Sequence, residues 1–467
     1  MPSVARLPPR QVRDLPDPPR NLWRIVGPGI VAAGIGLSSG EFILWPYIAS
    51  QVGLVLLWGA VIGVVTQFFI NMEVERYTLA TAETAVTGFN RFWKHWGLVF
   101  AVMVYFANLW PGWALSSATL ATYLFGGSAP VIGIIELLVI GAGLTLAPVI
   151  YVAVERLIFV KIAAVVVLAV LAVAFAVEAD SWRALPGGLT HIGQIPAGLS
   201  IALLFGAIAF AGAGGGQNLC QSNYIRDKGF GMGQYVPRLV SPITGAEVAA
   251  PTVSTFIFET TPANMARWRR WWNFANVEQF MSFVIVTVIT ICLTSMLAHS
   301  TLFGERGLPN SVAFLQIEAQ RLGATVGRWF GVLFLAVGAF SLFGSAMGII
   351  DYTSRLAADI VKTTYLPASP ITENRLYVWL VWGMVALGCG IVGLRLAQPL
   401  ALLIISATVG GTMMFLYSIL LIALNRTHLP DPLKMRSYRL VALVWAVLLY
   451  GTLALLTIRE QIRIVMS

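Results

Sequence analysis

Long runs of apolar residues, separated by short polar links, make up most of this chain. A helix needs roughly 20 mainly apolar residues to cross a lipid bilayer, and by that measure about eleven segments are long enough. They lie near 23–52, 54–72, 96–125, 129–149, 157–177, 196–225, 279–298, 327–350, 376–394, 397–424 and 439–458. The pattern predicts an all-α protein that crosses a membrane many times.

Two of these segments, the first and the sixth, are interrupted by glycine and small polar residues. The first contains Ser38, Ser39, Gly40 and Glu41, and the sixth contains Gly-Ala-Gly-Gly-Gly-Gln-Asn at 212–218. Lipid tails cannot hydrogen-bond a backbone, so a membrane helix unwinds only where protein or water satisfies the freed groups. Interrupted helices at matching positions of two halves are typical of a transporter's binding site. We therefore expect a small solute to bind near mid-membrane, between the two breaks.

Composition places the chain among multi-pass membrane proteins. Hydrophobic residues make up 58% and charged residues 11% of the sequence, and the mean hydropathy is +0.80. The expected organisation is a Pro/Arg-rich arm (1–22), a single transmembrane domain (23–458) and a short tail (459–467). The three cysteines predict neither a disulfide nor a metal cluster. Without a histidine cluster or an intramembrane carboxylate pair, we expect neither an enzyme nor a cofactor.

The charge of the chain indicates its orientation. Most of the 30 Lys and Arg residues fall on the cytoplasmic side if the N-terminus is cytoplasmic and the C-terminus lies outside. The net charge of +9 is then explained by topology and by attraction to membrane lipids, with no nucleic acid as a partner. The expected location is the plasma (inner) membrane, and the arm 1–22 is expected to be disordered or to lie on the membrane surface.

Two further features fall on the predicted cytoplasmic side. The segment 226–278 ends in interleaved arginine and tryptophan, Arg-Trp-Arg-Arg-Trp-Trp at 267–272, which is typical of a helix at the lipid headgroups. Asp351 follows the apolar part of the eighth segment and is expected to be an exposed charge at a helix end.

The motifs around the breaks resemble those of the Nramp family. They are Gly-Pro-Gly-Ile-Val-Ala-Ala at 27–33, Gly-Leu-Val-Leu-Leu-Trp at 53–58, Asn218-Leu219 and Asn425-Arg426. Nramp proteins are proton-coupled transporters of divalent transition metals. The resemblance implies two inverted five-helix repeats of the leucine-transporter type, with discontinuous helices 1 and 6. Here the repeats would be 23–177 and 196–424, followed by an extra helix at 439–458.

The family's metal site does not carry over to this sequence. The ligands Asp, Asn and Met of the family correspond to Ser38, Glu41 and Gly215. The helix-6 His of the family's proton route corresponds to Gln217, which does not titrate. Trp110 and Trp113 stand where the family has acidic residues, so a second part of that route is also replaced. The resemblance therefore concerns the fold more than the substrate.

The altered site predicts a secondary transporter of a small inorganic ion. Glycine backbone N–H groups and helix N-termini favour a small anion, for which bicarbonate is the preferred candidate, with Na⁺ or H⁺ as a coupling cation. Glu41 is assigned to the coupling ion or to a metal. A Mg²⁺ or Mn²⁺ transporter with hard oxygen ligands, or an ion channel, is the alternative. The predicted substrate cradle consists of Ser38, Ser39, Gly40, Gly214, Gly215, Gly216, Gln217 and Asn218, with Trp110, Trp113, Gln67 and Thr408 as pathway candidates.

Overall fold

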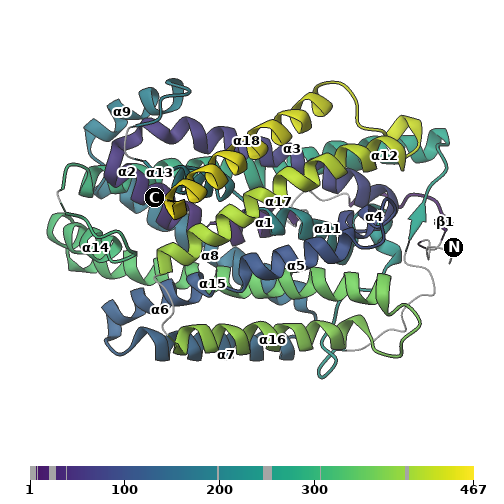
Figure 1. The fold of residues 1–467 in the computed structure, drawn as a ribbon, viewed down its shortest axis with the longest axis horizontal. Helices are drawn as coiled ribbons and strands as arrows, with labels where there is room; N and C mark the ends of the chain where they lie inside the picture. Colours follow the sequence, from purple (N-terminus) through teal and green to yellow (C-terminus); the bar gives the residue numbers. More distant parts are fainter. Residues whose placement is uncertain are drawn as a thin grey trace.

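The computed structural model describes residues 7, 9–19, 28–37, 39–196, 199–245, 255–305, 307–394 and 399–466. Most long helices run along the long axis of the molecule and form one bundle (Figure 1). The helices of the first half are α1 (Pro28–Gly36), η2 (Ser39–Leu44), α2 (Trp45–Val52), η3 (Gly53–Leu56), α3 (Leu57–Thr81), α4 (Ala85–Phe89), α5 (Trp96–Asn108), α6 (Gly112–Phe125), α7 (Ala129–Leu146), α8 (Ile150–Phe175) and α9 (Ala179–Thr190).

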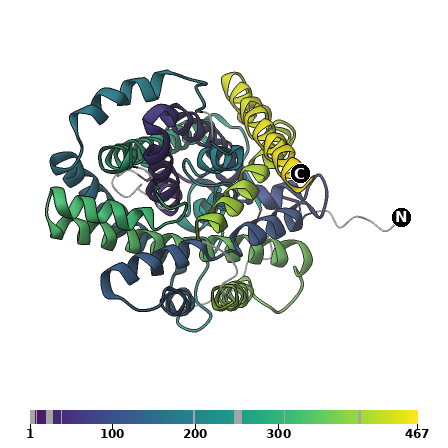
Figure 2. The same cartoon turned by 60° about the vertical axis from the view of Figure 1, so that its left-hand side comes forward.

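The second half also consists mainly of α-helices, and its last helix, α18 (Tyr438–Met466), lies on the outside of the bundle (Figure 2). Its other elements are α10 (Ile201–Ala209), α11 (Gly216–Lys228), η4 (Gly231–Tyr235), α12 (Pro262–Gln279), η5 (Phe280–Ile285), α13 (Val286–Leu302), α14 (Phe314–Thr325), α15 (Arg328–Ile360), η6 (Val361–Tyr365), α16 (Glu373–Gly393), α17 (Pro399–Thr427) and η7 (Asp431–Leu433). Two short strands, β1 (Gln11–Val12) and β2 (Phe256–Ile257), form the parallel sheet.

The number of membrane crossings agrees with the sequence. Nine helical stretches of the described residues are long and apolar enough to cross a membrane. The first stretch, Pro28–Thr81, contains the first two predicted segments, and α10 and α11 are each too short to be counted. The all-α, multi-pass fold with a discontinuous first and sixth helix is therefore confirmed, whereas the repeat boundaries stay a prediction.

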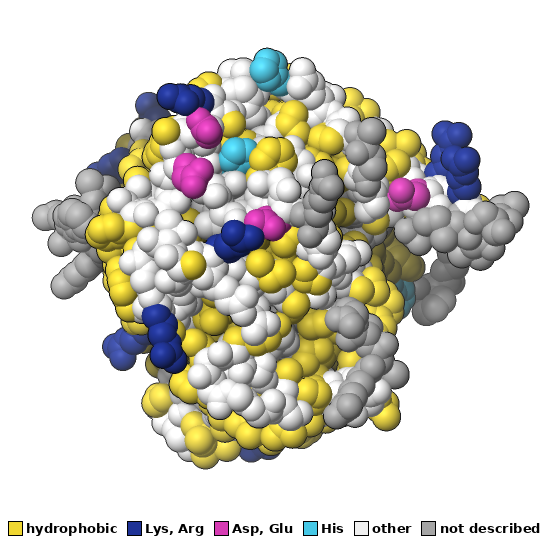
Figure 3. Space-filling model, turned by 90° about the vertical axis from the view of Figure 1, so that its left-hand side faces the viewer, with side chains coloured by type: hydrophobic (Ala, Val, Ile, Leu, Met, Phe, Trp, Pro, Cys, Tyr) yellow, Lys and Arg dark blue, Asp and Glu magenta, His cyan; other side chains and the backbone are white. Residues whose placement is uncertain are grey.

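The outer surface of the bundle is apolar. Val102, Phe159, Trp379 and Leu448 are each more than half exposed on four different helices. Figure 3 looks onto the end of the bundle that faces left in Figure 1, where hydrophobic side chains are interspersed with polar groups and a few charged side chains. The large apolar side chains exposed along the sides of the bundle fit contact with lipid.

The broken helices lie at the centre of the bundle. α1 packs against α8, α11 and α15, and α10 packs against α17. On one side of this centre, α7 and α16 lie side by side (Figures 1 and 2). Both breaks are thereby enclosed by protein, as the hydrogen-bonding needs of an unwound membrane helix require.

The N-terminal arm is held against the protein, so the expectation of a disordered arm is wrong for its described residues. β1 pairs with β2 in parallel, and Leu15 is fully buried. Trp271 of α12 is also fully buried, and its indole nitrogen donates to Pro16 O at 2.8 Å. The predicted headgroup position does not hold for Trp271, because α12 turns this side chain toward the arm.

Asp351 is buried, which corrects its prediction as an exposed charge. It accepts hydrogen bonds from Tyr224 Oη at 2.9 Å and Tyr377 Oη at 2.7 Å, and it forms an ion pair with Arg355 at 2.8 Å. The physical reason is the length of α15. This helix continues to Ile360, well past the predicted end of the segment at 350, so Asp351 lies inside the bundle.

Candidate functional site

The two breaks meet backbone to backbone. α1 ends at Gly36, and the chain resumes in the π-helical turn η2; Ser38 lies outside the described residues. A Cβ added to Gly36 would lie 1.9 Å from Gly212 O, and one added to Gly40 would lie 2.0 Å from Phe210 O. Both positions therefore require glycine, because no side chain fits between the first and sixth helices.

Polar side chains of two neighbouring helices satisfy the carbonyl groups freed at the end of α1. Ser345 Oγ of α15 donates to Ile35 O at 2.6 Å, and Ser341 Oγ donates to Leu37 O at 2.7 Å. The ammonium group of Lys161, on α8, donates both to Gly34 O and to Ser345 Oγ. The break in the first helix is thus bound to α8 and α15 by hydrogen bonds.

Three glycines allow the break in the sixth helix. The φ angles of Gly212, Gly214 and Gly215 are +125°, +76° and +84°, which L side chains rarely adopt. Gln67 of α3 bridges the turn. Its amide nitrogen donates to Ala209 O at 2.9 Å and Ala211 O at 3.0 Å.

The N–H groups of this break are already engaged. Those at 213 and 214 donate to Gln67 Oε1 at 2.8 and 3.3 Å. That of Gly215 donates to Asn218 Oδ1 at 2.8 Å, and that of Gly216 donates to Gly214 O at 3.1 Å. The predicted nest for an anion is therefore filled by oxygen atoms of the protein itself in this conformation.

The predicted polar ligands of the sixth helix serve the backbone. Gln217 Nε2 donates to Ala32 O at 2.7 Å and to Val31 O at 3.2 Å, which ties α11 to α1. Asn218 Nδ2 donates to Asn71 Oδ1 of α3 at 2.6 Å. Both side chains lie at the junction of the two breaks, as predicted, but their amide nitrogens stabilise the turns.

In the tenth helix, α17, the residue that contacts the break is Gly410 and not the predicted Thr408. Thr408 of α17 donates to Ile404 O, within its own helix, at 2.9 Å. Gly410, two residues later, lies against the break, because a Cβ added to Gly215 would be 2.4 Å from Gly410 O. The backbone of α17 therefore closes the third side of the glycine run.

Glu41 is the acidic residue at the junction. It lies in the first turn of η2 and is 1% exposed, and Ser39 beside it is also buried. Its charge acts on Lys161, which is fully buried near the middle of α8. A carboxylate and an ammonium group are thus both held at the broken first helix, where each reduces the cost of burying the other.

Lys161 was not predicted to be a site residue. The fifth segment was predicted to begin at 157, which placed the lysine near a membrane surface. α8 begins at Ile150, so the lysine lies well inside the bundle. The available signal was a lone basic residue in a long apolar stretch, because such a residue inside a membrane segment marks a functional site.

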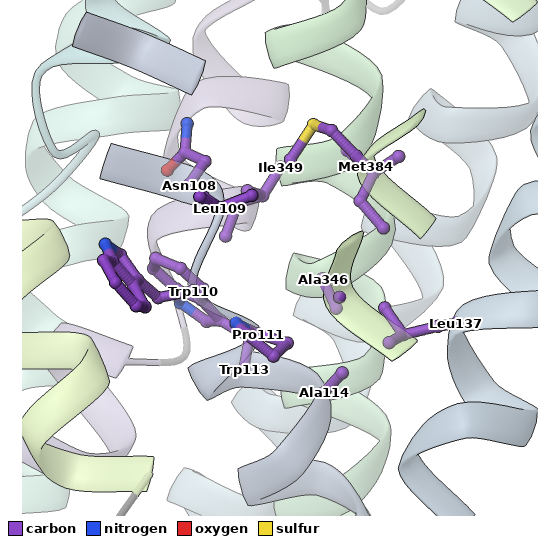
Figure 4. Close-up of a pocket in the computed structure, with 12 residues that line it drawn as sticks. Asn108, Leu109, Trp110, Pro111, Trp113, Ala114, Leu137, Ala346, Ile349 and Met384 are labelled. Carbon is purple, nitrogen blue, oxygen red and sulfur yellow. The ribbon is translucent and has the colours of Figure 1, made fainter. Parts of the chain in front are cut away.

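Trp110 and Trp113 line a pocket beside the junction (Figure 4). The pocket holds about 310 Å³ of empty space, open solvent included, at an interruption between α5 and α6. Trp113 reaches the sixth helix, because its ring lies 5.8 Å from that of Phe210. Asn108, also in the pocket wall, donates to Thr353 Oγ1 at 2.8 Å. The pocket is mainly apolar, and it borders the break without containing the predicted cradle.

The junction offers few metal-ligating side chains. In the part of the chain that the structure describes, no group of three or more His, Cys, Asp or Glu residues could hold a metal ion. A transported cation would therefore bind mainly to the Glu41 carboxylate, backbone carbonyl groups and retained water. Such a set of oxygen ligands suits hard cations, above all Mg²⁺.

Comparison with solved structures identifies the fold. A mutant of the Eremococcus coleocola manganese transporter matches with a TM-score of 0.68 and 13% identity, over 98% of this chain and 91% of that chain. A second mutant gives 0.69 and 14%, over 97% and 90%. The same transporter in complex with an aromatic bis-isothiourea substituted compound gives 0.68 and 13%, over 98% and 91%. No protein-family model matches the sequence, and no curated protein matches it.

These neighbours are structures of a manganese transporter. Their low identity limits the inference to architecture and leaves the substrate open. The order of the helices, the two central breaks and the match over nearly the whole chain all lead to one identification. This chain has the fold of the Nramp transporters.

Proposed function

We propose that this protein is a secondary-active membrane transporter of a small divalent cation, Mg²⁺ or Mn²⁺. Glu41 is its hard ligand, assisted by backbone carbonyl groups of the two breaks. The observation that carries the proposal is the distribution of donors and acceptors. The N–H groups at 213–216 are engaged by Gln67, Asn218 and the backbone, whereas a carboxylate is retained at the junction. An acceptor-rich site favours a cation.

The neighbouring structures support the same preference. They belong to a manganese transporter, and bicarbonate receives no support from them. Ser38, Glu41 and Gly215 stand where the family has Asp, Asn and Met, so the soft thioether ligand is absent and the carboxylate lies at the Asn position instead of the Asp position. Harder ligands favour ions such as Mg²⁺ and Mn²⁺ over softer transition metals. The proposal thus keeps the family's class of cargo and changes its selectivity.

Alternating access follows from the arrangement of the broken helices. In this fold, rocking of the bundle that contains the first and sixth helices exposes the central site to each side in turn. The buried junction, with Glu41 at 1% exposure, represents an occluded state. We further propose that the protein lies in the plasma membrane with its N-terminus in the cytoplasm, and that Na⁺ or H⁺ is the coupling ion.

Uptake into liposomes that contain the purified protein tests this function. Mn²⁺ and Mg²⁺ are followed with trapped dyes, and bicarbonate is followed through the internal pH. We expect metal uptake that Glu41→Gln abolishes. Asp180→Asn should leave uptake unchanged, because it removes an exposed carboxylate on α9. Bicarbonate flux without metal flux would refute the proposal and restore the anion, and metal flux unaffected by Glu41→Gln would refute the role of Glu41.

A further inference from the structure

A buried carboxylate without a hydrogen-bond partner lies on α3, between the breaks and the N-terminal arm. Glu75 is fully buried, and neither of its carboxylate oxygens has a hydrogen-bond partner among the described residues. It lies about 12 Å along the helix axis beyond Gln67, which bridges the break of the sixth helix. An ionised carboxylate is very unfavourable in such a place unless another group compensates its charge.

The helical spacing of α3 turns Glu75 toward the space between α11 and the end of α12. Asn71, one turn earlier, accepts a hydrogen bond from Asn218 of α11 at 2.6 Å. Phe68, two turns earlier, meets the ring of Phe280, the first residue of η5, edge-on at 6.2 Å. Residues four and seven positions apart share one face of a helix, so Glu75 faces the same two neighbours.

α11 brings a glutamine to this space. Gln217 donates to Ala32 O of α1 at 2.7 Å. Gln221 lies one turn later in α11, and Gly29 lies one turn earlier in α1. Because α1 runs toward the junction and α11 runs away from it, Gln221 and Gly29 lie at the same level. Gln221 is fully buried, and its amide oxygen and nitrogen have no hydrogen-bond partner in the described part of the chain.

The end of α12 adds a second carboxylate at the same level. Glu278 Oε1 accepts from Gly29 N at 3.1 Å and from Ser282 Oγ at 3.0 Å. These bonds hold the carboxylate at the start of α1, which is also the level of Gln221. The charge of Glu278 acts on Glu75, as expected for two carboxylates that face one space.

Gln279, the next residue, adds a second amide. It is fully buried, and within the described ranges neither atom of its amide group has a hydrogen-bond partner. Phe283, one turn later, lies beside Gln67, because a Cβ added to Gly212 would be 2.6 Å from the Phe283 ring and 3.2 Å from Gln67 Oε1. Gln279 therefore lies one turn closer to the arm, next to the face of α3 that carries Glu75.

We propose that these four residues, the inner cluster, bind a divalent cation, Mg²⁺ or Mn²⁺, at a second site between the junction and the arm. The inner cluster consists of Glu75, Gln221, Glu278 and Gln279. Its two carboxylates match the charge of one divalent ion, and amide oxygens and water complete a set of hard oxygen ligands. Such an ion accounts for the buried polar groups that the protein itself leaves without partners.

This inference rests on the proposed function and adds a second binding position for the same cargo. An ion released from Glu41 toward the arm would pass the inner cluster, since α1, α3 and α11 extend from the junction to it. The two sites use different carboxylates. A variant of one site therefore leaves the other site intact, so the two can be tested separately.

The number of Mn²⁺ ions bound to the purified protein tests the proposal. Equilibrium dialysis in detergent at saturating Mn²⁺ counts them. We expect Glu75→Gln to bind about one ion fewer than the wild type, because it keeps the shape of the side chain and removes its charge. Glu41→Gln should also lose about one ion, and the double variant about two. Glu305→Gln should match the wild type, because it replaces an exposed glutamate in the loop after α13.

Gln279→Met is a second variant of the inner cluster. It removes one amide oxygen and keeps the length of the side chain, so we expect the affinity for the second ion to fall about tenfold. If Glu75→Gln does not elute as a folded protein, Gln279→Met decides, and an unchanged Mn²⁺ affinity would overturn the second site.

The outcomes separate this inference from the proposed function. Equal Mn²⁺ counts for Glu75→Gln and the wild type are the result expected of a carboxyl that is simply protonated, and they would overturn the second site. If Glu41→Gln still loses an ion, the proposed function stands. Loss of an ion in Glu75→Gln but not in Glu41→Gln would support the inner cluster and overturn the role of Glu41. A wild type that binds neither Mn²⁺ nor Mg²⁺ would overturn both.

Discussion

At the scale of single residues, Gly215 determines whether the break can form. Its φ is +84°, and a Cβ would lie 2.4 Å from Gly410 O, a backbone atom that cannot turn aside. We expect Gly215→Ala to destabilise the protein by about 2 kcal/mol or more, from overpacking together with a disfavoured φ. Thermal unfolding in detergent measures this loss. Gly143→Ala is the control, because nothing lies within 4 Å of the Cβ it would gain.

The same contact bears on the family's methionine ligand. Gly215→Met would restore that ligand, but its longer side chain meets the same carbonyl of α17. We therefore expect this variant to gain no Mn²⁺ uptake in liposomes. Faster Mn²⁺ uptake than the wild type by a well-folded Gly215→Met protein would contradict this reasoning, because it would mean that α17 can move aside without loss of the fold.

Residue types predicted the place of the site better than its chemistry. Gln217 and Asn218 lie at the junction as expected, yet their side chains satisfy backbone groups. A sequence does not show which of several nearby acceptors an amide will reach, since that depends on the approach of another helix. Lys161 was missed for a related reason. Its importance comes from the end of α1, which lies more than a hundred residues earlier in the chain.

At the scale of elements, buried charges join α11, α15 and α16. Arg355 is fully buried and pairs with Asp227 and Asp351, and Tyr377 of α16 donates to Asp351. Removal of this cation leaves Asp351 without its ion pair and Asp227 with Arg226 alone, at 3.9 Å, so we expect Arg355→Met to destabilise the protein by about 3–5 kcal/mol. Thermal unfolding with Arg183→Met as control measures the effect, because Arg183 lies on the surface. Equal midpoints for the two variants would show that this network contributes nothing to stability.

A second cluster of charges fastens the N-terminal arm. Glu83 follows α3 and is buried with Arg10 of the arm at 3.1 Å and with Arg91. Burial by itself would raise the pKa of Glu83, but hydrogen bonds and charges of Arg91, with the charge of Arg10, lower it below the ordinary value. A carboxyl with a lowered folded pKa stabilises the protein above its unfolded pKa and loses this effect as the pH falls through the folded value.

The lowered pKa of Glu83 predicts how the stability of a Glu83→Gln variant, relative to the wild type, changes with pH. Near neutral pH, we expect the variant to be less stable than the wild type by about 3 kcal/mol, because two arginines lose their buried partner. The difference in unfolding midpoint should shrink as the pH falls below about 4 and Glu83 becomes protonated. Thermal scans from pH 7 to acid pH test this, with the surface variant Asp180→Asn as the reference. A difference that stays constant with pH would exclude ionisation of Glu83 as its cause.

Elements were predictable where a local pattern defines them. Apolar length located the membrane helices, and glycine-rich runs located the breaks, because both are properties of neighbouring residues. The arm and α12 were predicted less well. Their structure depends on contacts between residues about 250 positions apart, such as Leu15 N with Asn264 Oδ1 at 3.1 Å. Amphipathic composition alone could not distinguish a helix against lipid from one that packs on the arm.

For the whole molecule, we expect an odd number of crossings, about eleven, which would place residues 12 and 459 on opposite sides of the membrane. β1 and the C-terminus lie toward opposite ends of the bundle in Figure 1. Val12 and Arg459 are both exposed, so a cysteine at either position could react with a thiol reagent. With positive residues on the cytoplasmic side, we expect an impermeant reagent to label Arg459→Cys, which would lie outside, but not Val12→Cys in intact cells. Both variants should react after permeabilisation. The unmodified chain gives the background, because Cys220 is buried and Cys292 and Cys389 are half-buried. Labelling of Val12→Cys alone in intact cells would reverse the orientation, and labelling of both would contradict an odd number of crossings.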